Sequence, residues 1–450
     1  MPTDMTFGVS RDRGLFEWSG TSLATVFAQK SNLFNPRMWI MLFDIIRFNQ
    51  FALNLLSEED ESENYPSASH DIPSKLGKPR HQQSIGEYLQ KENYSEAFRD
   101  DYLIPMTAAV WSTAPDKASL EFPAVTLVRF MWNHHLLSTV AARPQWMTIP
   151  GGSQQYIDAV MASFPKDHLH VGSCVKSLRV SNDGPVVLLL SDGVEQLFDH
   201  VILATHADQA LEIIRNTASA EEREILSGFG FSTNTAVLHS DISVCTPLYS
   251  LHVSNSAVCP LIDWSQLMPI RSAAWSSWNY ITTTPSDSDD VLSVCLTYWM
   301  NLLQHIPSSR YGHVLVTLNP ITQPDPALVQ GSWNYHHPLY NAKAIYSQKL
   351  LPTIQNRKGI SYAGAWTKYG FHEDGFSSGV KVAMEHLGAE LPFDFVDSTF
   401  SRGRKPRLCW LDYLVRVFVW TIQSIIQVIR GPKSLTGISH SYVDKQHKIQ

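Results

Sequence analysis

The spacing of apolar residues divides the chain into a helical first third and a strand-rich middle. Apolar residues recur at helical intervals over residues 36–56, which predicts an amphipathic helix. Residues 6–20 alternate around the turn sequence Asp12-Arg-Gly14 and predict a β-hairpin. Further helices are predicted at 84–91, 95–103, 125–133 and 341–351, and strands at 168–180, 185–190, 198–204, 231–239, 291–300 and 311–318.

The most informative stretch runs from Tyr362 to Gly379. The apolar residues at 359–363 predict a short buried strand, and the apolar spacing after Gly375 predicts a helix that begins there. Glycines and an acidic pair lie between them. A strand followed by a glycine-rich turn and a helix N-terminus can hold an anion or a polarised carbonyl, because the first helical turn has free N–H groups. Ordinary turn glycines would give the same spacing.

The sequence Tyr369-Gly-Phe-His-Glu-Asp-Gly-Phe-Ser-Ser-Gly379 decides between these interpretations. It resembles the C-terminal, flavin-contacting segment of the flavin-containing amine oxidase superfamily. The resemblance implies an α+β / α/β fold of two domains, a Rossmann-like FAD domain and a mixed substrate domain. It also implies an FAD-dependent oxidoreductase that removes a hydride from a small apolar or amine-bearing substrate, in lipid or secondary metabolism.

The resemblance also assigns roles to individual positions. His372 and Tyr369 would be catalytic, near the flavin ring. Apart from the resemblance, the aromatic residues Trp278, Tyr280 and Trp333 could line an apolar substrate pocket, and core packing would explain each of them singly. No metal is expected, because the adjacent pair His134-His135 would point about 100° apart on a helix. The residues expected to touch FAD are Val175, Ala204, Thr205, Gly364, Ala365, Asp374, Gly375 and Phe376.

One part of the family pattern is not found in this chain. Family members open with a strand, G-x-G-x-x-G and a helix that bind the ADP half of FAD, but no such glycine motif occurs here. The resemblance begins at about Met5 and ends at about Phe393, so the FAD domain is expected to miss its first βαβ unit. A gene model without its first exon and a shortened protein both explain this. A shortened protein could be a non-catalytic homologue that acts as a binding module.

Composition and the resemblance together predict how the chain is divided into segments. Residues 57–80 are acidic and polar and predict a disordered loop, and residues 245–266 interrupt the family pattern as an insertion. The expected segments are 1–145 (substrate domain), 146–206 (FAD domain), 207–356 (substrate domain), 357–395 (FAD domain) and 396–450 (basic linker, amphipathic helix and tail).

Composition narrows the choice of partners. A formal net charge of −7 argues against nucleic acid. Five scattered cysteines without a C-x-x-C pair predict neither a zinc site nor a disulfide framework and favour a reducing, cytoplasmic compartment.

The C-terminal part combines basic and apolar residues. Residues 402–407 are basic, and the apolar run 408–429 contains Asp412 and Arg416. This run is short of the roughly 20 apolar residues that a membrane span needs. It predicts either an amphipathic helix in peripheral contact with a membrane or a helix docked on its own domain.

Overall fold

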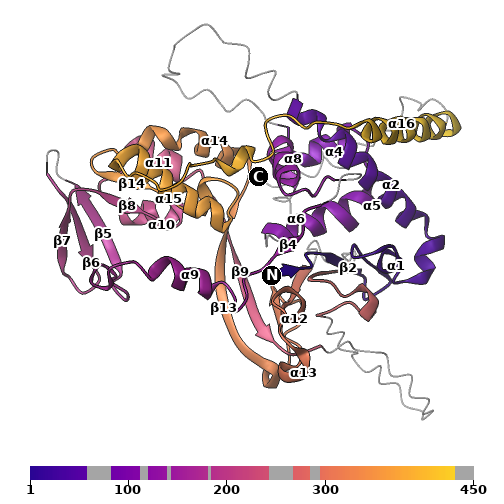
Figure 1. Cartoon of the computed structure of the whole chain (residues 1–450), viewed down its shortest axis with the longest axis horizontal. Coiled ribbons are helices and arrows are strands. Elements are labelled where there is room, and N and C mark those ends of the chain that lie inside the picture. The colour runs from indigo at the N-terminus through magenta and orange to yellow at the C-terminus, as the bar shows by residue number, and fades with distance from the viewer. Residues whose placement is uncertain are drawn as a thin grey trace, which may run out of the picture.

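The computed structural model describes residues 1–57, 83–111, 120–138, 143–180, 184–242, 267–283 and 294–430. Its largest element is a seven-stranded mixed sheet, with the strand order β13-β9-β12-β11-β10-β2-β3 (Figure 1). The bounds of the strands are Phe7–Arg11 (β2), Phe16–Ser19 (β3), Gly230–His239 (β9), Trp278–Thr282 (β10), Val294–Trp299 (β11), Leu315–Leu318 (β12) and Val329–Leu339 (β13).

The predicted N-terminal hairpin is confirmed, and its neighbour in the large sheet is β10. β2 pairs antiparallel with β3 and parallel with β10, so Val9 lies between Trp18 and Tyr280. Asp12 and Gly14 in the turn have positive φ values, of 50° and 80°, which a short polar residue and a glycine tolerate best. A strand near residue 280 therefore completes the structure that begins at residue 7.

Helices pack on the apolar face of this sheet and form the larger core. Alternate strand residues Val9, Tyr280 and Leu296 point into it and are at most 5% exposed. The predicted helices are confirmed, and Ser84 and Glu87 form a capping box at the start of one of them. The helices are α1 (Leu23–Val26), η1 (Lys30–Phe34), α2 (Pro36–Phe51), α4 (Ile85–Lys91), α5 (Glu96–Phe98), η2 (Arg99–Leu103), α6 (Ile104–Trp111) and α8 (Ala124–Asn133).

Two buried carboxylates connect distant parts of the larger core. Asp101 is fully buried, and its two oxygens accept hydrogen bonds from Nε of Arg11 and Nε of Arg37, both at 2.6 Å. Glu17 is also buried and accepts the Arg271 guanidinium at 2.8 Å and its backbone N–H at 3.1 Å. A buried charge is tolerated only when it is paired in this way.

A second, smaller core contains two further sheets. An antiparallel meander is formed by β5 (Val175–Val180), β6 (Val186–Leu190) and β7 (Glu195–Phe198), and a parallel pair by β8 (Val201–Leu203) and β14 (Ile360–Tyr362). The single strand predicted at 198–204 is wrong, because Asp199 and His200 separate β7 from β8 and the two join different sheets. The helices of this core are α10 (Ala207–Ile213), α11 (Ala220–Leu226), α14 (Ala342–Leu350) and α15 (His372–Leu387).

Other predicted elements are only partly confirmed or fall on residues that the structure does not describe. The strand predicted at 291–300 is confirmed over residues 294–299. The strand predicted at 311–318 is confirmed only in its second half, 315–318, because residues 308–311 form a helix. The loop predicted at 57–80, except residue 57, and the insertion predicted at 245–266 lie outside the described residues. The remaining elements are β1 (Pro2–Thr3), β4 (Trp146–Met147), α9 (Gln154–Met161), η3 (Lys166–His168), η4 (Ser272–Ala274), α12 (Met300–Leu303), α13 (Ser308–Tyr311), η5 (Pro326–Leu328), η6 (Leu351–Ile354), η7 (Ala365–Thr367) and η8 (Ser398–Phe400).

The last described helix is α16 (Trp410–Arg430), which extends beyond the larger core (Figure 1). Gln50 Nε2 at the end of α2 donates to Asp412 Oδ1 at 3.0 Å, and Arg416 donates to Asn54 Oδ1 at 3.1 Å. Within the described part of the chain, no helix is both long and apolar enough to span a bilayer.

Candidate functional site

The carboxyl ends of β8 and β14 form a common edge. Both strands run in the same direction, and Ala363 N–H donates to Leu203 O at 3.0 Å, so residues 204–205 and 364–365 leave the sheet side by side. Such an edge is where ligands bind in parallel sheets. We call residues 204–205 and 362–378 together the strand–helix corner.

Trp366 connects the segment that follows β14 to the segment that follows β8. Its indole N–H donates to Thr205 O at 2.9 Å, its ring meets Phe229 edge-on at 4.6 Å, and it is only 1% exposed. Gly364 precedes it with φ 147°, and a Cβ there would lie 2.4 Å from the indole nitrogen of Trp366. The chain therefore needs a glycine at position 364 to place the indole.

Helix α15 begins earlier than the sequence predicts. Its first residue is His372, so Gly375 lies inside the helix and not in the turn before it. The reason is Asp374, whose Oδ2 accepts the backbone N–H groups of Phe371 at 2.9 Å and Tyr369 at 3.2 Å. A carboxylate at this position of the first turn stabilises the helix start.

Asp374 has a structural task that limits what else it can do. It is 3% exposed, and this burial raises the pKa of its carboxyl group. One of its oxygens is already held by two backbone donors. Its predicted contact with FAD stays a prediction.

Ser378, four residues after Asp374 in α15, also stabilises the segment before the helix. Its hydroxyl accepts the N–H of Gly364 at 2.8 Å and donates to Gly375 O at 2.7 Å. The sequence analysis did not single it out. Serine one turn into a helix after glycine was the available signal, since its hydroxyl can reach the preceding turn.

The two predicted catalytic residues lie on opposite sides of the helix start. The exposed His372 meets the ring of Tyr156 edge-on at 4.7 Å, which places α9 beside α15. Tyr369 lies in the loop, its ring 5.6 Å from that of Phe130. Its carbonyl accepts the Trp111 indole N–H at 3.0 Å. The structure places both residues at the corner, and their catalytic roles stay predictions.

Of the predicted cofactor residues, Val175 is the one outside the corner. It starts β5 in the meander and is partly exposed. The meander reaches the corner indirectly, because a Cβ at Gly359, just before β14, would lie 3.0 Å from the Val186 side chain. The predicted contact of Val175 with FAD stays a prediction.

The three predicted substrate-pocket residues are not brought together. Trp278 and Tyr280 lie on β10, and Trp333 lies on β13, four strands away in the same sheet. At about 4.8 Å per strand this separates them by roughly 19 Å. Tyr280 is 1% exposed, and burial raises its pKa well above the usual value, whereas Trp333 is 49% exposed.

In the described ranges, no group of three or more His, Cys, Asp or Glu side chains could hold a metal ion. His134 Nδ1 lies 2.9 Å from Phe130 O at the end of α8, as expected of a residue that terminates a helix.

The corner suits the ring end of a flavin. Ala204 and Phe376 are exposed, and the N–H groups of His372 and Glu373 lie in the first helical turn, where no intrahelical acceptor exists. A Cβ at Gly375 would approach only Ala365, at 3.5 Å. An oxygen-bearing planar ring can therefore reach both the donors and the backbone, and the residues present fit FAD at this end.

One family model and several solved structures match this chain. The sequence profile described as "flavin containing amine oxidoreductase" matches residues 80–386, and the comparison with curated proteins gave no match. Among solved structures, the fold is similar to a CLA-producing fatty acid isomerase from P. acnes (12% identity, TM-score 0.49, 86% of this chain and 81% of that one). It is also similar to a reduced UDP-galactopyranose mutase (14%, 0.41, 74% and 72%) and an oxidoreductase from Methanosarcina mazei (13%, 0.45, 85% and 81%). At this level of identity, the substrates of those proteins do not indicate the substrate of this chain.

Proposed function

The chain belongs to the flavin-containing amine oxidoreductase family and is an FAD-dependent oxidoreductase, and we propose that its substrate is small and either apolar or amine-bearing. When bound, FAD supplies a hydride acceptor for a C–H bond of the substrate. The residues of the corner determine how the ring is held and what can approach it.

The observation that supports this substrate class is the aromatic character of the loop before α15. Phe371 stacks on Phe130 at 5.2 Å with 12° between the rings, and Trp111 lies 6.3 Å from Phe371. Tyr340 is 5% exposed, and burial raises the pKa of its hydroxyl well above the usual value, so it stays neutral. These rings belong to the larger core or pack against it, and they form an apolar wall behind the loop. Apolar groups are favoured beside such a wall, whereas a polyanion finds no partner there.

The chain offers two groups for proton movement at this place. His372 is exposed at the start of α15, and an imidazole can accept or give a proton near neutral pH. Tyr369 lies three residues before it. Trp111 holds the Tyr369 carbonyl, which fixes the backbone of the loop. We assign His372 the proton transfer and Tyr369 the positioning of substrate beside the ring.

Flavin binding at the corner can be tested with a matched pair of glycine variants. Gly375→Leu puts a side chain beside Ala365 and should weaken FAD binding by about tenfold or more, since it fills the approach to the backbone. Gly379→Leu, one turn further along α15, has no atom within 4 Å of the added Cβ and serves as control. Bound FAD is measured by absorbance after desalting and by titration of flavin fluorescence.

A purified chain that binds no added FAD would contradict the proposal and favour the non-catalytic homologue. The substrate class is tested separately, by anaerobic flavin reduction with apolar amines, apolar alcohols and dicarboxylates. His372→Ala should slow reduction by about 10²-fold or more at unchanged FAD affinity, while His168→Ala, exposed and remote on η3, should not. Equal reduction by dicarboxylates would contradict the assigned substrate class.

A further inference from the structure

Helix α16 is docked with its polar side inward. Asp412 and Arg416, on one side of the helix, are held by Gln50 and Asn54 at the end of α2, and Val419 on the same side is fully buried. Residues four and seven apart share a helix face. The side chains of Asp412 and Arg416 are thus engaged by the rest of the protein.

The opposite side of α16 is apolar and exposed. Trp410, Leu414, Val417, Phe418, Ile425 and Val428 recur at helical spacing and are between 53% and 81% exposed. Tyr413 and Trp420 flank this stripe and are 58% and 66% exposed. A helix that faces water normally has the reverse arrangement. We call these eight residues the apolar face of α16.

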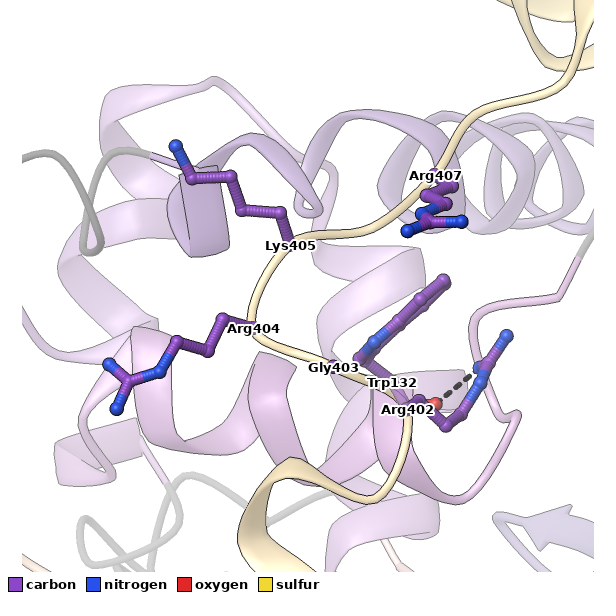
Figure 2. A pocket seen from close by; sticks show the side chains of 6 residues that line it. All are labelled: Trp132, Arg402, Gly403, Arg404, Lys405 and Arg407. Atoms are coloured by element: carbon purple, nitrogen blue, oxygen red, sulfur yellow. Dashed lines mark hydrogen bonds between the residues drawn. The ribbon is translucent and has the colours of Figure 1, made fainter.

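A basic segment leads into this helix. Residues 402–407 contain Arg402, Arg404, Lys405 and Arg407 and no acid, in a chain whose formal net charge is −7. They line an open cavity of about 600 Å³ together with Trp132 of α8. Figure 2 shows their side chains leaving a single extended stretch of chain in different directions above Trp132.

This basic segment is held in place by α8. The Arg402 guanidinium lies 3.7 Å from the centre of the Trp132 ring and donates to the Trp132 carbonyl (Figure 2). Arg129 donates to the backbone carbonyl of Arg404. Arg407 is exposed, and within the described residues its guanidinium has no hydrogen-bond or ion-pair partner. The segment therefore presents positive charge from a fixed backbone.

We propose that α16 and residues 402–407 form a docking surface for an anionic lipid bilayer, with the apolar face in the headgroup–acyl boundary and the cavity at Trp132 against lipid phosphates. Indole and phenol rings beside an apolar stripe suit that boundary. Clustered cations are attracted to an anionic leaflet. A second copy of the chain would explain the apolar face but not the cluster of cations that leads into it.

Vesicle flotation of the full chain with bound FAD tests the proposal. The chain should float with phosphatidylcholine vesicles that contain phosphatidylserine, and far less with phosphatidylcholine alone or at high salt. Leu414→Glu/Phe418→Glu should weaken binding by about a hundredfold or more, since charge replaces exposed apolar groups. Arg404→Ala/Lys405→Ala/Arg407→Ala should weaken it by at least about tenfold and remove the salt dependence.

The matched control changes two leucines that lie elsewhere on the surface and are more exposed than Leu414 and Phe418. Leu15 and Leu23 are 75% and 77% exposed near the N-terminal hairpin, and Leu15→Glu/Leu23→Glu should float as the unchanged chain does. Circular dichroism and FAD content verify that each variant is folded.

Three results would overturn the proposal. They are no flotation, equal flotation with both vesicle types, and self-association in sedimentation that is abolished by Leu414→Glu/Phe418→Glu without any vesicle binding. The last result would assign the apolar face to a second copy of the chain.

Discussion

The larger and the smaller core differ in how completely their own residues cover them. In the larger core, Met38, Met41 and Phe48 of α2 are fully buried against the sheet and its helices. Helix α9, which contacts α15 through Tyr156 and His372, has no buried residue, and Ile157 and Val160 on it are 43% and 50% exposed. The inner face of α2 is thus covered by the larger core, whereas α9 leaves apolar surface beside the corner proposed to hold FAD. Stability should therefore depend on the cofactor in one region and on internal ion pairs in the other.

The largest effect is expected from Asp101 in the larger core. Asp101→Ala leaves Arg11 and Arg37 without their buried partner and should lower the free energy of unfolding by about 3–5 kcal/mol. Urea unfolding measures the change. The neighbouring Asp100→Ala is the control, since its pair with Arg99 is partly exposed and should contribute at most about 1 kcal/mol. Equal losses in the two variants would contradict the importance of burial.

Removal of FAD should affect the smaller core and leave the larger one unchanged. Saturation at 100 times the dissociation constant stabilises the FAD-bound state by about 2.7 kcal/mol. Hydrogen exchange of the amides in β8, α9 and the first turn of α15 should slow when FAD binds, while α2 and α8 should exchange as before. Uniform slowing across both cores would show that they do not respond independently.

Trp366→Phe should disturb the corner more than the same change elsewhere. It deletes the donor to Thr205 O and leaves a small cavity, at a cost of about 2 kcal/mol, and should weaken FAD binding. The control is Trp275→Phe, whose indole donates to Pro269 O at 2.7 Å outside the smaller core. Thermal unfolding and FAD titration give the two readouts, and loss of FAD affinity in both variants would contradict a role specific to the corner.

The smallest effect concerns pH and the larger sheet. Burial lowers the pKa of His239, whose Nδ1 accepts Asp241 N–H at 3.2 Å while Nε2 lies 2.7 Å from Thr317 Oγ1. The unfolded chain therefore binds a proton more readily, so stability should fall as the pH drops below about 6.5. His239→Gln should make this fall shallower and the exposed His170→Gln should not, as measured by urea midpoints at several pH values. Identical slopes would contradict it.

Local signals were enough to predict much of the larger core. The hairpin followed from its turn residues, and the helix at 85–91 was predicted from the local spacing of apolar residues over 84–91. β13 was not predicted, because residues 329–339 show no regular alternation and their strand exists through pairing with β9. The division between β7 and β8 was missed for the same reason, since β8 pairs with β14, which is remote in sequence.

At the site, the sequence identified the corner but not the hydrogen bonds that hold its segments together. The glycines and Asp374 marked the place, while the bonds from Trp366 to Thr205 and from Trp111 to Tyr369 join segments that are far apart in the chain. Periodicity revealed both faces of α16 without indicating which one turns toward the protein.

Helix α8 gives the molecule a mechanical link. Phe130 and Trp132 are two positions apart and so project from opposite sides of one rigid rod. The first ring lies against the residue that precedes α15, and the second lies under the guanidinium of Arg402 in the basic segment. A flavin at the corner and a lipid surface at the basic segment would therefore adjoin opposite sides of the same helix.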